Sequence, residues 1–587
     1  MKRMLLNKEK IVMKRIIPIF LLIVFTPVLI IKGQEPSIKR EITLYNPYKP
    51  SLPDVVKKSF LPDMTDTVKV KPDIRYDIKT YPFTPPYAIS PLKPATMVPD
   101  PLTKLYNSFI NFGIGNYLTP LAEISITSLR SKKGTAGLYA SHFSTNGKVK
   151  LDDDSRVFAG YMDNNISLYG KKFLNESVLK GSVDFKQMTR YAYGYDTDTL
   201  RAIYHPSKKD VRLDYFTAGA STGISSMKQD SSELSYDINA GYVFFHSNKN
   251  YYQHNLRLNA LASKEIKGFY AGSGLEIDYS KPSDTISSSF RLITSLSPFL
   301  KKKTSEWDVK IGAKLLFDKF FTEEYSKLHI YPDIRFGFNI IPSYLGFFAE
   351  LSGKLEKNTP EEVVLRNPYI LPDEKFYRIP NTSYPLIVKT GVEGETGIEG
   401  RYRLNVSYSF TDENYLLFSG YLLTAGNIAM LSGGNYFIPV YDEAEILNIH
   451  GEMTGKINRQ FSFYTEADYF KYNLASSQYA WGKPAWQAKF DLKYNLRDKI
   501  IAAAGLTALG ERKFIETINN ILVSPPTFEQ IFQRPSVVNL NISAEYRYTK
   551  ILSFWLKFNN ISFSRYYEWA FYPSLRFMCM AGFTYSL

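Results

Sequence analysis

The chain has 587 residues, of which 44% are hydrophobic and 15% aromatic, and its formal net charge is +15. A single cysteine, Cys579, excludes an intramolecular disulfide framework. The basic residues stand in short breaks between apolar segments, as at Lys132-Lys133 and Lys301 to Lys303, and are not gathered in one domain. This distribution argues against a nucleic-acid partner. It fits two alternatives, contacts to anionic lipid headgroups or solvated turns.

Residues 1–33 have the composition of a cleaved export signal. Lysines and arginines precede the apolar stretch from Ile16 to Ile31, which contains Pro18 and Pro27 and ends before Gly33. The stretch is short of the roughly 20 residues that a membrane-spanning helix needs, so a signal peptide is favoured over an uncleaved helix. We expect the mature chain to be exported.

Residues 34–105 form a proline-rich segment. Between Glu35 and Pro101 lie thirteen of the 32 prolines of the chain. Fixed φ angles and missing amide donors disfavour regular helix or sheet there. We expect an extended periplasmic arm, which would lie along a surface, under the barrel or inside it.

From about Tyr106 to the end, apolar residues recur with a period of two. Examples are the strands predicted around Val309 to Phe317, Leu404 to Phe410 and Trp486 to Tyr494. Strict alternation indicates strands with one apolar face, and a wall between lipid and water needs that pattern. The fold class predicted for residues 106–587 is all-β, a transmembrane antiparallel β-barrel.

Short and long breaks alternate between these strands. Ten hairpins plus one opening and one closing strand predict about 22 strands, within a range of 18–22, and an even number fits a bacterial barrel. The longer gaps, near residues 146–155, 196–210, 358–385, 425–444 and 513–536, would then be extracellular. The ten short breaks lie near Lys132, Lys171, Gln229, Lys267, Lys303, Ser343, Gly400, Asn458, Asp498 and Lys550.

The chain ends inside a predicted strand. Its apolar positions include Phe577, Phe583, Tyr585 and Leu587. A barrel must seal its last strand against its first, because an open sheet edge cannot face lipid. We therefore predict that this aromatic segment is the closing strand.

The segment from Asn559-Asn560-Ile561 through Tyr566, Tyr572-Pro573 and the terminal strand resembles the closing hairpin of TonB-dependent outer-membrane receptors. That resemblance, which covers residues 536–587, implies a 22-stranded barrel in the outer membrane and transport of a solute. Receptors of this family also carry a plug domain, for which the region before the first strand is too short. A weak match to their TonB-binding box is Asp66, Thr67, Val68, Lys69 and Val70.

Catalytic and metal signals are weak, so we expect neither an enzyme nor a cofactor. Gly219 to Gly223 matches the G-x-S-x-G string but lies in a predicted strand, without the strand-turn-helix context of a nucleophile elbow. The six histidines show no zinc-ligand spacing. Asp152-Asp153-Asp154 would be a solvated acidic loop or, less simply, a Ca²⁺ ligand set.

Polar residues between the apolar positions would face the lumen. The predicted lining comprises Arg403, Lys489, Asp491, Lys493, Glu545, Arg547 and Lys557. An open barrel of this width would leak, so either the arm or folded-in loops should occlude it.

Two functions follow as expectations. The first is transport of a solute across the outer membrane. The second is a structural role as scaffold of an envelope complex, in barrel assembly or surface-lipoprotein machinery. Expected partners are outer-membrane lipids including lipopolysaccharide, the barrel assembly machinery during biogenesis, and a periplasmic or lipoprotein partner that docks on the arm.

Overall fold

The computed structural model describes most of the chain from Ser108 to Leu587. The predicted signal peptide (1–33), the predicted arm (34–105) and the TonB-box-like residues 66–70 lie outside the described residues. Within the range that begins at Ser108, the residues left undescribed are 130, 198–206, 228–232, 250, 283–289, 321–324, 371–378, 398, 426–427, 430–435 and 521–526.

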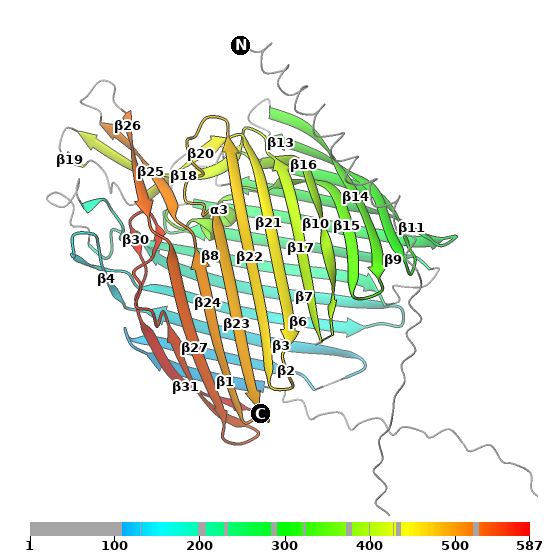
Figure 1. The fold of residues 1–587 in the computed structure, drawn as a ribbon, viewed down its shortest axis with the longest axis horizontal. Helices are drawn as coiled ribbons and strands as arrows, with labels where there is room; N and C mark the ends of the chain where they lie inside the picture. The colour runs from blue at the N-terminus through cyan, green and yellow to red at the C-terminus, as the bar shows by residue number, and fades with distance from the viewer. Residues whose placement is uncertain are drawn as a thin grey trace, which may run out of the picture. The chain divides into compact units, whose positions relative to one another are not determined.

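Twenty-two antiparallel strands form one closed wall (Figure 1), which confirms the predicted fold class and strand number. The first half of the wall comprises β1 (Ser108–Gly115), β2 (Thr119–Thr127), β3 (Gly134–Thr145), β6 (Tyr161–Phe173), β7 (Ser177–Tyr191), β8 (Arg212–Ser226), β9 (Ser235–Ser247), β10 (Tyr251–Ile266), β11 (Phe269–Pro282), β12 (Arg291–Lys303) and β13 (Trp307–Phe320). The second half comprises β14 (Tyr325–Ile341), β15 (Leu345–Glu356), β16 (Thr382–Thr396), β17 (Gly400–Phe410), β21 (Ala444–Lys456), β22 (Phe461–Leu474), β23 (Trp486–Leu496), β24 (Ile500–Leu509), β27 (Val537–Arg547), β28 (Leu552–Asn559) and β31 (Met578–Ser586).

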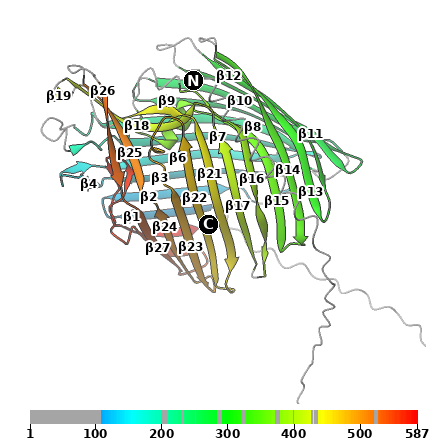
Figure 2. The ribbon, with the colours of Figure 1, turned by 45° about the horizontal axis from the view of Figure 1, so that its top comes forward.

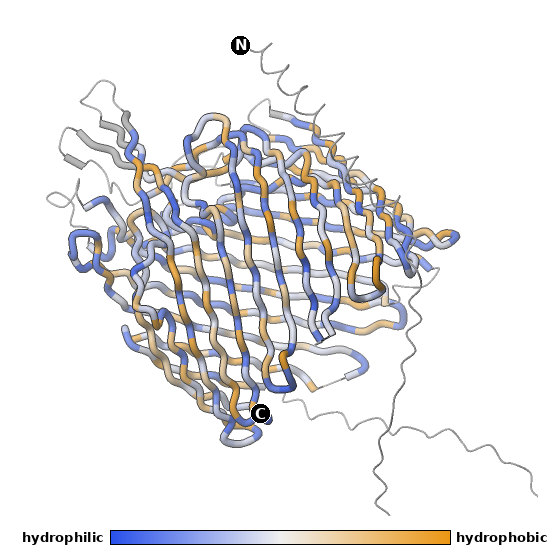
Figure 3. Tube along the Cα trace, viewed as in Figure 1, coloured by the Kyte–Doolittle hydropathy of each residue, from blue (hydrophilic) through white to orange (hydrophobic). Residues whose placement is uncertain are grey.

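Hydrophobic and hydrophilic residues alternate along the strands of the wall (Figure 3). In β13, Ile311 is 58% exposed although it is isoleucine, whereas its neighbour Lys310 is paired with Asp333 at 2.5 Å. Successive side chains of a strand point to opposite faces, so one face can meet lipid while the other keeps its charges away from it. The wall is therefore built for a membrane.

Nine of the ten predicted short breaks lie in a turn, or within three residues of one, on the rim at which β1 begins and β31 ends. The tenth, near Gln229, lies outside the described residues. The turn between β10 and β11 is the tightest, because only Lys267 and Gly268 join the two strands, both with positive φ (52° and 78°). Two positive φ angles are typical of the two-residue turn that matches strand twist. Short turns mark the periplasmic rim and longer loops the extracellular rim.

The seam between β31 and β1 closes the wall, as the closing-strand prediction required. Phe583 lies opposite Phe112, with ring centroids 6.1 Å apart. On the other face, the Trp555 indole of β28 lies over Gly113 and Gly582, where any Cβ would overlap its ring. Its Nε1 donates to Asn111 Oδ1 at 2.7 Å, so one side chain ties three strands together.

The remaining described elements belong to the loops of the extracellular rim. Figure 2 shows β4, β18, β19, β25 and β26 together at one end of the barrel. Among the described residues, no helix is long and apolar enough to cross a membrane. These elements are β4 (Lys148–Lys150), β5 (Arg156–Phe158), α3 (Pro360–Arg366), β18 (Tyr415–Ala425), β19 (Ile428–Ala429), β20 (Tyr436–Asp442), β25 (Arg512–Asn520), β26 (Thr527–Arg534), β29 (Tyr567–Trp569) and β30 (Tyr572–Pro573).

Candidate functional site

Six extracellular loops share one hydrophobic core, and we call this assembly the cap. It is formed by the described parts of residues 146–160, 192–211, 357–381, 411–443, 510–536 and 560–577. Buried side chains from all six pack together with the loop-side ends of β7 to β10. The loops follow strands spread around the wall, so their shared core joins distant parts of the rim. The loop members of this core include Val149, Tyr193, Val363, Tyr369, Phe437, Phe514 and Tyr572.

Specific contacts across the rim hold the cap together. Tyr369 stacks on Tyr572 with ring centroids 3.9 Å apart. The Tyr193 hydroxyl donates to the Pro573 carbonyl at 2.9 Å, and the Tyr215 hydroxyl donates to the Pro368 carbonyl at 2.7 Å. A buried tyrosine whose hydroxyl is hydrogen-bonded contributes a large apolar surface to the core, and the hydrogen bond fixes the orientation of its ring. The high tyrosine content thus serves the cap as well as the membrane wall.

The loop between β15 and β16 contributes the helix α3, whose start is encoded locally. The Thr359 side chain accepts from the Glu362 amide, and the Glu362 carboxylate accepts from the Thr359 amide, a complete capping box. Pro360 follows at the first helical position, where its missing amide costs nothing. Val363 and Val364 are buried in the core of the cap.

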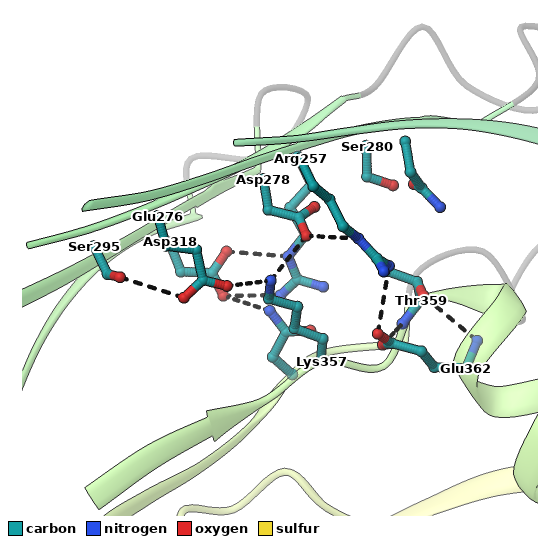
Figure 4. Close-up of polar contacts among 12 residues, drawn as sticks. Arg257, Glu276, Asp278, Ser280, Ser295, Asp318, Lys357, Thr359 and Glu362 are labelled. Carbon is teal, nitrogen blue, oxygen red and sulfur yellow. Dashed lines mark hydrogen bonds and ion pairs between the residues drawn. The ribbon is translucent and has the colours of Figure 1, made fainter. Parts of the chain in front are cut away.

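A polar network, the clamp, fastens this loop to the inner wall (Figure 4). The Lys357 ammonium donates to Glu276 of β11 at 2.7 Å and to Asp278 of β11 at 2.8 Å. Arg257 of β10 approaches Asp278 at 3.2 Å and Glu362 of α3 at 3.6 Å. We define the clamp as the loop charges Lys357 and Glu362 and the wall charges Arg257, Glu276 and Asp278, which alternate in sign along the network. Lys314 of β13 adds a further contact to Glu276, at 3.2 Å.

Because the clamp is largely buried, each of its charges needs an oppositely charged partner. Asp278 is only 2% exposed, and a buried charge that loses its partner is costly. Burial alone would lower the pKa of Lys357, but the carboxylates of Asp278 and Glu276 outweigh it and raise that pKa above its ordinary value. Lys357 therefore stays charged in the folded loop although it is largely buried.

A second anchor lies at the other end of the same loop. Arg291 forms a two-bond pair with Asp318, at 3.0 and 2.9 Å, and Asp318 is fully buried. Asn381 donates to the same carboxylate at 3.0 Å, and Arg291 also donates to the Ile379 carbonyl at 3.4 Å. Both ends of loop 357–381 are therefore bonded to the inner faces of β11 to β13.

Glu516 of β25 is an unusual acidic residue within the cap. It is fully buried, and neither carboxylate oxygen has a hydrogen-bond partner. Burial, with a further contribution from nearby Asp196, raises the pKa of Glu516 to about 8. The carboxyl group is accordingly neutral at neutral pH, which lowers the desolvation cost of placing it there.

The predicted lining residues lie on the face of the wall opposite to the exposed apolar rows. Arg403 donates to Glu393 at 2.7 Å, Lys489 pairs with Asp491 at 3.0 Å, and Arg547 approaches Glu545 at 3.5 Å. Lys557 lies over the Trp555 ring at 4.7 Å, and Lys493 lines the same hollow of the wall as Asp491. Their role along a conducting path stays a prediction.

The sequence analysis missed the partners of loop 357–381. The string Thr359-Pro360-Glu361-Glu362 is a helix-start signal that could have indicated α3. Arg257, Asp278 and Asp318 carried no signal, because only strand register brings them to one patch. Register also joins His450 of β21 to Asp468 of β22, at 2.9 Å and beside Glu466, although no histidine spacing suggested a cluster.

Two weak motifs have ordinary surroundings. Gly219 to Gly223 lie within β8, where the Ser221 hydroxyl is 2.9 Å from that of Ser182 on β7. Asp152, considered above as a calcium ligand, is instead held by Arg534 at 2.8 Å and by the Tyr567 hydroxyl.

Comparison with solved structures identifies the architecture. The siderophore receptor PirA from Acinetobacter baumannii superposes with a TM-score of 0.59 at 11% identity, covering 82% of this chain and 80% of that one. The pyoverdine outer-membrane receptor FpvA from Pseudomonas aeruginosa PAO1 gives 0.58 at 9%, covering 83% and 79%. The copper transporter OprC gives 0.59 at 9%, covering 82% and 80%.

No protein-family model matches the sequence, and no curated protein matches it either. At such low identity the structural likeness establishes the fold. Together with the closed wall and its exposed apolar face, it confirms the fold that the closing hairpin suggested. The chain is a closed 22-stranded β-barrel with the fold of TonB-dependent outer-membrane receptors.

Proposed function

We propose that the barrel transports a solute across the outer membrane and that the cap is its extracellular gate. The clamp carries this proposal. It joins a loop to the inner wall through ion pairs and hydrogen bonds, and water or a polar solute can replace such contacts during opening. The fold shared with siderophore receptors and a copper transporter supports the same role.

In this proposal the lumen is occluded by the folded-in loop 357–381 and the cap core. The loop is held at both ends, by Lys357 at its start and by Asn381 at its close. A solute would enter when the cap core parts and the clamp charges separate. The charged lining, including Arg403 and Lys489, would then offer a polar path.

Conductance in planar bilayers tests the gate. Four proteins are compared: the full chain, a variant with residues 358–380 replaced by a short Gly-Ser linker, a variant lacking residues 34–105, and the combination. We expect the loop variant to conduct steadily while the full chain stays closed. Conductance that needs only removal of 34–105 would assign the occlusion to that segment, and silence in all four would favour a scaffold and overturn the proposal.

A point substitution tests the clamp more gently. Lys357→Met leaves Asp278 without its ammonium partner, so the closed state should lose about 2 kcal/mol, or roughly thirtyfold in the closed-to-open ratio. Single-channel recording should show more frequent openings. Lys354→Met, three residues earlier and 57% exposed in its side chain, is the matched control and should open no more than the unaltered chain.

A further inference from the structure

A short hairpin of the cap has two chemically different faces. β4 and β5 pair with Lys150 opposite Arg156 and Val149 opposite Val157. Val149 is buried in the cap core and Val157 packs against that core. Alternation therefore places Lys148, Lys150 and Arg156 on the other face, and all three are exposed.

Placing these cations together costs stability. Like charges directly opposite each other in a strand pair repel, and Lys150 and Arg156 are such a pair. Lys148 adds a third positive charge two residues away on the same face. A basic face of this kind gains stability when an anion lies over it.

The loop before the closing strand completes the site. Arg565 and Arg576 join Lys148, Lys150 and Arg156 around a hollow of about 450 Å³, and Figure 1 shows β4 close to β30 of that loop. The Arg565 guanidinium donates to the Lys150 carbonyl at 2.7 Å, which ties the two loops together. Among the lining residues that the structure describes, none is acidic.

Nearby carboxylates leave most of this charge uncompensated. Asp154 pairs with Lys150 at 3.2 Å, and Asp152 approaches Arg565 at 3.4 Å but is shared with Arg534. Lys148, Arg156 and Arg576 form no ion pair with any residue in the described part of the chain. Arg565 Nε, at this hollow, is buried without a hydrogen-bond partner.

We propose that this hollow is a binding site for a phosphate-type oxyanion, held by the basic face of the β4–β5 hairpin together with Arg565 and Arg576. Guanidinium groups present paired donors that match phosphate oxygens, and lysine ammonium groups add point charge. The phosphate group could belong to a soluble molecule or to a lipopolysaccharide headgroup at the rim. The site is independent of the clamp and does not require the transport proposal.

Two binding measurements on the full-length protein test the site. Calorimetry with inorganic pyrophosphate, on protein in uncharged detergent, reports a soluble ligand. Co-purification of lipopolysaccharide from mixed vesicles, compared with lipopolysaccharide stripped of its phosphates, reports a headgroup. The test variant carries Lys148→Gln, Arg156→Gln and Arg576→Gln, and the charge-matched control carries Lys132→Gln, Lys209→Gln and Lys303→Gln at exposed sites elsewhere.

Each removed cation should weaken binding about tenfold, so the three substitutions together should weaken it about a thousandfold while the control changes little. Binding of pyrophosphate, or retention of phosphorylated lipopolysaccharide alone, supports the site and identifies the source of the phosphate. Equal losses in both variants, or binding in neither measurement, would overturn it. Protease resistance of the cap, measured in parallel, shows that the test variant is folded.

Discussion

The wall and the cap obey opposite rules of burial. In the wall, Val183 is 57% exposed and Ile311 58%, while the charges lie on the inner face. In the cap, Val363 and Phe437 are almost fully buried, as in a water-soluble domain. The wall exposes its apolar side chains as a lipid-facing surface does, whereas the cap buries them as a water-soluble domain does. Because the cap core reaches the wall at the loop-side ends of β7 to β10, we expect the cap to loosen by local unfolding while the rest of the wall stays paired.

The largest expected effect lies in the cap core. Tyr572→Ala removes a ring that is 1% exposed and stacked on Tyr369, and should destabilise the cap by about 4 kcal/mol. Limited proteolysis should then cut the cap loops. The wall should remain folded, so the unheated protein should still migrate on a denaturing gel as a folded barrel. Tyr548→Ala, at a tyrosine that is 59% exposed, is the control. If the wall unfolded together with the cap, the cap would not be an independently unfolding part of the protein.

A second prediction concerns the pH dependence of the cap. The pKa of Glu516 is about 8 in the folded cap and near 4.5 when unfolded, so the unfolded form releases its proton first. Cap stability should therefore fall as pH rises from about 4.5 to about 8 and level off above. Glu516→Gln should remove that slope and stabilise the cap at pH 7 by about 3 kcal/mol.

Hydrogen exchange of cap amides between pH 5 and 9, corrected for intrinsic exchange rates, measures this effect. Glu529→Gln, at an exposed glutamate of the neighbouring strand β26, should keep the slope of the unaltered chain. The same slope in the Glu516→Gln variant would show that another group governs the cap.

A third prediction addresses the wall alone. Ile311→Arg places a charge on the lipid-facing side and should cost about 2 kcal/mol in a bilayer. Urea unfolding in phospholipid vesicles measures it. The control is Lys310→Arg, on the opposite face of the same strand and paired with Asp333 outside the clamp. Because the cap is a separate unit, its protease resistance should not change, and a more easily cut cap would contradict that independence.

The smallest expected effect is at the lining. The Lys489–Asp491 pair has side chains about half exposed, so Lys489→Ala should change stability by no more than about 0.5 kcal/mol. Its influence should appear in function, as lower anion preference of the channel opened by removing residues 358–380. Reversal potentials across a salt gradient measure this, and an unchanged selectivity would remove Lys489 from the conducting path.

The same comparison explains how far the sequence could be interpreted. Period-two alternation is local, so the wall, most of its short turns and its closing strand were predictable from the sequence. The cap has no such period, because its core is made by side chains such as Tyr193, Tyr369 and Tyr572 that are far apart in the chain. The clamp depends on register as well, since Asp278 and Arg257 meet only through strand pairing.

The closing hairpin contains residues whose positions the sequence predicted correctly and residues whose positions it did not. The predicted last strand comprised Phe577, Phe583, Tyr585 and Leu587. Phe583 and Tyr585 lie in β31, whereas Phe577 precedes that strand and Leu587 follows it. Tyr572-Pro573 was read as part of the same hairpin, but it forms β30 in the cap core. An aromatic residue near the end of a strand looks the same in sequence whether it faces lipid or a neighbouring loop.

The seam has a consequence for the order of assembly. Trp555, Gly582 and Asn111 meet across a sequence separation of more than 440 residues. Loop closure over such a length is slow and entropically costly, so this contact should be among the last to form. Until then the first and last strands expose unpaired amides and carbonyls, which can pair with other chains. Once the Trp555 indole packs on the two glycines, these edges are hydrogen-bonded to each other and no longer exposed.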